Sequence, residues 1–221
     1  MVRSPAVSTT PGLRERKKEQ TRQAIREAAL RLFAERGFDG VTVAEIAGEA
    51  DVSVATVFNY FPTKEDLVYG QLEVFEAELL DAVRDREPGE SVLAAFVRFV
   101  GEPRGWLVSK DPEAAERLEA ITRIITSSPE LIARENEIFA RYAQSLAELL
   151  AAETGASASD STPGVAAYAL IGVHRTLIDQ TRKEILAGTP TARLARNVRL
   201  QAKRALELLE RGLQDYGTKP R

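Results

Sequence analysis

Residues 52–67, VSVATVFNYFPTKEDL, bring together side chains that are suited to reversible binding rather than to bond-making. Phe58, Tyr60 and Phe61 fall within four positions, and Asn59 stands among them. Aromatic rings can pack on the sugar-phosphate backbone of a nucleic acid, and an amide side chain can exchange two hydrogen bonds with a base edge. A small core has no room for all three rings, so we expect part of this surface to contact a partner.

Two short helices joined by a tight turn are predicted to position these side chains. Thr42 has Glu45 three residues later, which is the spacing of a capping box that starts the first helix. Ser53 is a typical N-cap for the second helix, and Pro62 ends it because proline disfavours helical geometry in the residue before it. A longer helix over residues 16–36 precedes this pair, so the segment is a predicted helix-turn-helix.

The second short helix is predicted to have one buried face and one outer face. Val57 and Phe61 are four residues apart, so they share the face that we assign to the core beside Ile46 and Phe33. The positions left mostly outside are Val54, Ala55, Thr56, Phe58, Asn59 and Tyr60. A half-buried place at the core edge stays the alternative for Tyr60, and a capping role alone stays the alternative for Thr42 and Ser53.

Positive charge is concentrated near the start of the chain although the net charge is −3. Through Lys64 there are ten Lys and Arg against eight Asp and Glu, a net of +2, so the remainder carries −5. Most of the basic excess lies in LRERKKEQTR, residues 13–22. A local basic face is sufficient for an anionic partner, because charges beyond about 10 Å are screened at physiological salt.

The composition argues against an enzyme and against a metal or organic cofactor. The chain has no cysteine and one histidine, His174, which excludes thiolate metal sites and disfavours a zinc site or a serine-type triad. It also has no glycine-rich phosphate loop. No apolar run reaches the roughly 20 residues that span a bilayer, and residues 1–20 lack the apolar centre of a secretory signal, so we expect a cytoplasmic protein without a membrane partner.

The whole chain is predicted to be all-α, with about nine helices. Ala, Leu, Glu and Arg dominate, and alternating strand patterns are absent. We expect a flexible arm over residues 1–13, a three-helix DNA-binding domain over 14–64 and a helical domain over 65–216. One long helix over residues 63–86 is expected to lead from the first domain into the second.

The segment LRERKKEQTRQAIREAALRLFAERGFDGVTVAEIAGEADVSVATVFNYFPTKEDL resembles the DNA-binding domain of TetR-type bacterial transcriptional regulators. The resemblance covers about a quarter of the chain and includes its caps and turn. It implies DNA contacts from Arg14, Lys17, Lys18, Thr42, Ser53, Val54, Ala55, Thr56, Phe58, Asn59, Tyr60 and Lys64. The family often has tyrosine where this chain has Phe58, so apolar packing is expected there without a hydroxyl contact.

The C-terminal part resembles the domain of mycofactocin-type regulators, on the stretches ITRIITSSPELIARENEIFARYAQSLAELLA and AYALIGVHRTLID. That resemblance implies an acyl-CoA-like effector. The expected pocket consists of Phe96, Phe99, Trp106, Ile121, Ile125, Phe139 and Tyr142, with Arg123 and His174 as polar contacts. Ordinary core packing stays the alternative for each aromatic residue.

The last two helices are expected to pair with a second copy of the chain. Their predicted interface residues are Val165, Ala169, Val173, Leu177, Leu194, Val198, Ala205 and Leu209. The alternative is that these apolar stripes complete the core of a single chain. The resulting prediction is a homodimeric repressor that a small molecule releases from operator DNA. A helical DNA-binding protein without an effector stays the alternative.

Overall fold

The computed structural model describes residues 12–70, 72–111 and 113–212, without the side chains of Glu15, Glu73, Trp106 and Arg211. The described residues form ten α-helices and one 3₁₀ helix and contain no β-strand, which confirms the predicted all-α class. None of the described helices is long and apolar enough to cross a membrane. Residues 1–11 of the predicted arm and 213–216 of the predicted second domain lie outside the described residues.

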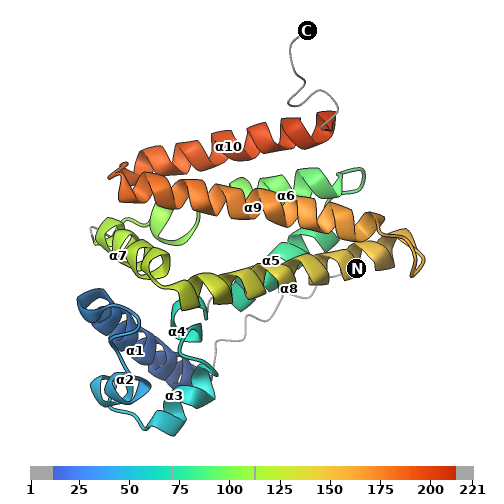
Figure 1. Cartoon of the computed structure of the whole chain (residues 1–221). Coiled ribbons are helices and arrows are strands. Elements are labelled where there is room, and N and C mark those ends of the chain that lie inside the picture. The colour runs from blue at the N-terminus through green and yellow to red at the C-terminus, as the bar shows by residue number, and fades with distance from the viewer. Residues whose placement is uncertain (1–11, 71, 112, 213–221) are drawn as a thin grey trace, which may run out of the picture. The chain divides into compact units, whose positions relative to one another are not determined.

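The chain divides into two compact units, Met1–Gly70 and Gln71–Arg221. The first unit contains α1 (Leu13–Arg36), α2 (Val43–Glu49), α3 (Val54–Tyr60) and α4 (Asp66–Tyr69) (Figure 1). The predicted boundary of this domain is Lys64. The compact unit extends to Gly70 and includes α4, which packs against α1.

Burial of a few large side chains holds the short helices of the first unit in place. Ile25, Phe33, Ile46, Val57 and Phe61 are each at most 1% exposed. Helices α2 and α3 have seven residues each, which is too short for a stable isolated helix. Packing of α2 against both α1 and α3 therefore supplies the stability that helix propensity lacks.

The predicted single helix over residues 63–86 is wrong, because the structure has α4 and α5 in its place. Helix α4 ends at Tyr69, Gly70 follows, and α5 begins at Leu72. Arg22 Nη2 donates a 3.1 Å hydrogen bond to the Gly70 carbonyl oxygen. A Cβ atom at position 70 would lie 2.7 Å from the Asp66 carbonyl oxygen and 3.0 Å from Phe61 Cε1. Glycine is therefore required here for space, since its φ of −60° suits any residue.

The second unit is a set of packed helices with its own core. Its elements are α5 (Leu72–Arg84), α6 (Val92–Gly101), η1 (Gly105–Val108), α7 (Ala114–Ser127), α8 (Pro129–Thr154), α9 (Thr162–Leu186) and α10 (Thr191–Arg211). Helix α9 packs along α8, and α10 packs on α6 and α9 (Figure 1). A buried ion pair joins α8 to α9, with Arg182 Nη1 and Nη2 donating to the two Glu135 carboxylate oxygens at 2.7 and 2.5 Å.

We expect Gly70→Ala to lower the free energy of unfolding by about 1–3 kcal/mol, because the added methyl group overpacks the contact with Phe61. Gly48→Ala is the matched control, since a Cβ atom at this helical position meets nothing within 4 Å. The control should gain up to about 1 kcal/mol from helix propensity. Urea unfolding followed by circular dichroism measures both variants, and equal stability would show that Gly70 is not sterically constrained.

Candidate nucleic-acid interface

The N-terminus of α2 is closed by the predicted capping box. The Thr42 hydroxyl accepts from Glu45 N at 3.3 Å and donates to Glu45 Oε2 at 2.7 Å. Thr42 N donates to the same carboxylate oxygen at 2.8 Å. Arg36, followed by the backbone and hydroxyl of Thr42, lowers the pKa of the Glu45 carboxyl to about 2. Because this ionised carboxylate already holds Thr42, a phosphate contact from the Thr42 hydroxyl requires exchange of its partner.

The turn between α2 and α3 depends on an aspartate in left-handed geometry. Asp51 has a φ of 52°, and among the described residues it is the non-glycine residue with positive φ. Its N–H donates to the Gly48 carbonyl oxygen at 3.2 Å, and Val52 N donates to the Ala47 carbonyl oxygen at 2.9 Å. Aspartate tolerates this geometry better than most residues. The turn therefore directs the chain from α2 into α3 without a glycine.

Helix α3 has the two faces that the sequence predicts. Val57 is 1% exposed, whereas Val54 and Phe58 are 41% and 46% exposed. Ala55 and Asn59 are also exposed, while Thr56 and Tyr60 are half-buried. Val54 and Phe58 are four residues apart, so two large apolar side chains share the outer side of this seven-residue helix.

Polar groups on α3 divide into those that hold the helix and those that are available. Ser53 Oγ accepts from Thr56 N at 3.0 Å, so Ser53 is the predicted N-cap. The hydroxyls of Ser53 and Thr56 also lie 2.8 Å apart. The side chains of Asn59 and Tyr60 make no hydrogen bond to any residue that the structure describes. Their amide and hydroxyl groups are therefore free for a base edge or a phosphate.

Lys64, which is predicted to contact a phosphate, is held by groups of the first unit. Its Nζ donates to the Phe38 carbonyl oxygen at 2.6 Å and lies 4.1 Å from the centroid of the Phe38 ring. The same atom is 5.6 Å from the centroid of the Phe33 ring. This ammonium group joins the segment before α4 to the connection between α1 and α2, so its observed role is to position that connection.

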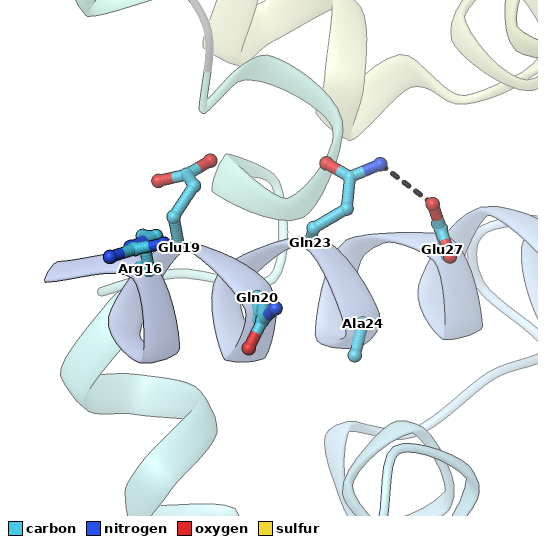
Figure 2. A pocket seen from close by; sticks show the side chains of 6 residues that line it. All are labelled: Arg16, Glu19, Gln20, Gln23, Ala24 and Glu27. Atoms are coloured by element: carbon cyan, nitrogen blue, oxygen red, sulfur yellow. Dashed lines mark hydrogen bonds between the residues drawn. The ribbon is translucent and has the colours of Figure 1, made fainter. Parts of the chain in front are cut away.

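Helix α1 carries the remaining predicted contacts. Arg14, Lys17 and Lys18 are exposed. A pocket also runs along α1 and is lined by Arg16, Glu19, Gln20, Gln23, Ala24 and Glu27 (Figure 2). Figure 2 shows Gln23 donating to Glu27, at 2.7 Å between Nε2 and Oε1. Two carboxylates against one guanidinium disfavour an anion, so we do not assign this pocket to phosphate binding.

Most of the residues predicted for the effector pocket are buried in the second unit. Phe96, Phe99, Ile125, Phe139, Tyr142 and His174 are buried, and Ile121 is half-buried. The structure places Arg123 elsewhere: it is exposed and donates to Glu119 one turn earlier on α7, at 2.6 Å. The side chain of Trp106 lies outside what the structure describes. Sequence reasoning missed Phe75, whose ring stacks on His174 at 4.8 Å between centroids.

The residues predicted for a dimer interface fall into three groups. Val165 is 68% exposed and Ala169 is exposed, whereas Val173, Val198, Ala205 and Leu209 are half-buried. Leu177 and Leu194 are only 8% and 2% exposed, because they belong to the core of their own chain. Tyr168, at 61% exposure, and the exposed Gly172 also lie on α9, although the sequence prediction does not include them.

We expect Lys64→Met to destabilise the protein by about 1–2 kcal/mol, because it removes a hydrogen bond and a cation–π contact. The slope of log binding constant against log salt concentration for duplex DNA should not change. Lys17→Met removes the same charge from an exposed site. It should reduce the magnitude of this negative slope by about 0.9 without loss of stability. If Lys64→Met instead made the slope shallower at unchanged stability, Lys64 would be a phosphate contact.

Comparisons with known proteins agree with this architecture. The family described as "Bacterial regulatory proteins, tetR family" matches residues 25–69. The family described as "MftR C-terminal domain" matches residues 87–214. The first matched range lies within the first compact unit, and the second lies within the second unit.

Individual relatives show the same similarity. The putative mycofactocin biosynthesis regulator MftR of Mycobacterium tuberculosis is 27% identical over 162 residues, covering 72% of this chain and 78% of the relative. The regulator TcmR of Streptomyces glaucescens is 30% identical over 168 residues, covering 71% and 72%. The repressor NalD of Pseudomonas aeruginosa has a similar fold, with a TM-score of 0.56 at 21% identity over 91% of this chain and all of that one. The chain therefore belongs to the TetR family of bacterial transcriptional regulators, and its C-terminal domain is of the MftR type.

Proposed function

We propose that this regulator is a homodimeric repressor that binds operator DNA through α3 and leaves it when a small molecule binds the second unit. The observation that carries the DNA-binding part is the outer face of α3. It combines exposed Val54 and Phe58 with the unpaired amide of Asn59. Burial of Val57 on the opposite face fixes the rotation of the helix, so these groups are presented together.

Direct reading of bases by α3 is sparse. The helix VATVFNY has no arginine or glutamine, which are common base readers. Asn59 is our candidate for an adenine contact, and Val54 or Ala55 suits the methyl group of thymine. With so few direct readers, the sequence dependence of DNA shape is expected to supply part of the specificity.

A homodimer fits the spacing of the DNA. Two reading helices must enter successive major grooves about 34 Å apart, which requires two copies related by a two-fold axis. We propose the outer face of α9 as the centre of this interface, because Val165, Tyr168, Ala169 and Gly172 combine exposed apolar and small side chains there. A two-fold interface places the same surface on both subunits.

Charge disfavours the outer face of α10 as that centre. Exposed Arg193, Arg196, Lys203 and Arg204 make no ion pair with any described residue. Pairing of this face with its own copy would bring like charges together, which is costly when they lose water. We therefore expect α9 to form the centre of the contact with the second copy, with the Lys and Arg side chains of α10 at its solvated rim.

The small-molecule part of the proposal rests on the second unit. Resemblance to mycofactocin-type regulators supports an acyl-CoA-like effector, and the match of residues 87–214 supports the same domain type. The buried aromatic rings of this unit are the proposed apolar lining. Coupling requires that the effector binds the DNA-free arrangement of the dimer more tightly than the DNA-bound one.

We expect the wild-type protein to bind the DNA upstream of its own gene, in a fluorescence anisotropy titration that weakens with salt. Phe58→Ala removes an exposed ring and should weaken binding by roughly tenfold or more, without loss of folding stability. Tyr60→Phe removes only the unpaired hydroxyl and should have a smaller effect. Ile132→Ala, at an exposed site of α8, is the control. Unchanged affinity of Phe58→Ala would remove this face of α3 from the interface.

We expect Tyr168→Glu to convert the dimer into monomers, because it places two charges at the centre of a two-fold contact. Leu200→Glu is the matched control on the outer face of α10, where Leu200 is 46% exposed. Sedimentation velocity over a range of concentrations measures both. Dissociation by Leu200→Glu but not by Tyr168→Glu would move the interface to α10.

A further inference from the structure

His174 lies inside a cluster of aromatic rings contributed by three helices of the second unit. Its ring stacks on Phe75 of α5 at 4.8 Å between centroids and 10° between planes. Phe139 of α8 meets it edge-on at 5.8 Å and 86°. Phe75 also contacts Phe99 of α6 and Tyr142 of α8, at 5.3 and 6.2 Å. Only 8% of His174 is exposed.

The polar atoms of His174 differ from those of the other buried polar residues in the described part of this unit. Thr122 donates to the Leu118 carbonyl oxygen at 2.6 Å, and Ser128 caps α8 by accepting from Leu131 N at 3.4 Å. Glu135 is held by Arg182. Within the aromatic cluster itself, the Tyr142 hydroxyl donates to the Leu72 carbonyl oxygen.

His174 makes no hydrogen bond to any residue that the structure describes. Its ring nitrogens are not among the fully buried unpaired side-chain atoms of the described residues, so a partner from outside the chain can reach them. Where the chain offers no partner, native structures usually satisfy such a polar group with water, an ion or a ligand. An imidazole held among aromatic rings therefore indicates a polar partner from outside the chain.

The electrostatic surroundings of His174 indicate which charge and which hydrogen-bonding groups suit that partner. Burial, and then the charge of Arg104, lowers the pKa of His174 to about 4, so its ring is neutral near pH 7. A neutral imidazole offers one N–H donor and one acceptor nitrogen. Arg104 is anchored nearby: its guanidinium lies 3.8 Å from the centroid of the Phe99 ring and donates to the Phe99 carbonyl oxygen. This positive charge disfavours a cationic ligand and favours an electron-rich oxygen.

We propose that His174 donates a hydrogen bond to the carbonyl or carboxylate oxygen of an apolar acyl compound whose chain packs on the surrounding aromatic rings. This inference rests on the proposed effector response and assigns its specificity-determining contact. The acyl oxygen satisfies the imidazole N–H, and the aromatic rings bury the hydrocarbon. Small-molecule sites commonly combine such an apolar lining with few polar groups that fix orientation.

The experiment measures ligand binding without DNA, by isothermal titration calorimetry at pH 7.5. The probes share one chain length: decanoyl-CoA, decanoate and decylamine. Decanoyl-CoA and decanoate distinguish a thioester ligand from a free carboxylic acid. Decylamine has the same chain with an ammonium group and no acyl oxygen. We expect at least one acyl probe to bind, and decylamine to bind at least tenfold more weakly.

His174→Phe tests the contact itself, because phenylalanine keeps the ring and removes both nitrogens. We expect a loss of roughly tenfold in acyl affinity, together with an unchanged or higher melting temperature of the ligand-free protein. A residue that serves only the fold would show the opposite pattern. His174→Gln restores a donor and should recover part of the affinity. Arg123→Gln is the matched control, since Arg123 is exposed and paired with Glu119.

Equal acyl affinity of the wild type and His174→Phe would overturn the assignment of His174. Tighter binding of decylamine, or no binding of either acyl probe, would overturn the ligand class. These outcomes are separate from the proposed function, because operator binding and its release by other compounds are measured by anisotropy. Loss of operator binding by Phe58→Ala, for example, leaves the calorimetric result unaffected.

Discussion

The rotation of α3 about its own axis is the constraint on which the proposed DNA-binding surface depends. Val57 and Phe61 are fixed in the core of the first unit, and both are 1% exposed. A helix of seven residues has little stability of its own, so this burial decides both whether it forms and which way it faces. Phe58 and Asn59 face outward because the residues beside them are fixed inward.

Several cations of the first unit make hydrogen bonds that hold its fold. Lys64 bonds the Phe38 carbonyl oxygen, Arg22 bonds the Gly70 carbonyl oxygen, and Arg36 bonds Glu45 at 2.8 Å. Glu45 in turn occupies the N-terminus of α2, where a phosphate would otherwise be attracted. In the complex that we propose, the exposed Lys and Arg side chains of α1 therefore supply the electrostatic attraction for DNA, while α3 supplies packing and a single amide.

The second unit combines a packed interior with two distinct outer faces. Among its described residues, the buried Thr122, Ser128 and Glu135 are bonded within the chain, whereas His174 makes no hydrogen bond to a described residue. The outer face of α9 carries apolar and small residues. The outer face of α10 carries Lys and Arg side chains that make no ion pair with a described residue. These differences match the three tasks that we propose for this unit: recognition of an effector, pairing of two copies, and solvation of the rim of their interface.

The sequence by itself determined the features that depend on neighbours within one turn of helix. The capping box of Thr42, the N-cap at Ser53 and the inward face of Val57 and Phe61 follow from short spacings, and the structure has all of them. The family resemblance adds operator DNA as the expected partner of the outer face, which local spacing does not name.

Tertiary structure alone decided the features that depend on residues far apart in the chain. Lys64 meets the Phe38 carbonyl oxygen 26 positions earlier, and the ring of Phe61 limits the space for a side chain at Gly70. Phe75 meets His174 across almost one hundred residues, and Leu194 is buried by its own chain rather than by a second copy. Helical periodicity shows which face is apolar, but it does not show what covers that face, because the covering side chains come from other helices.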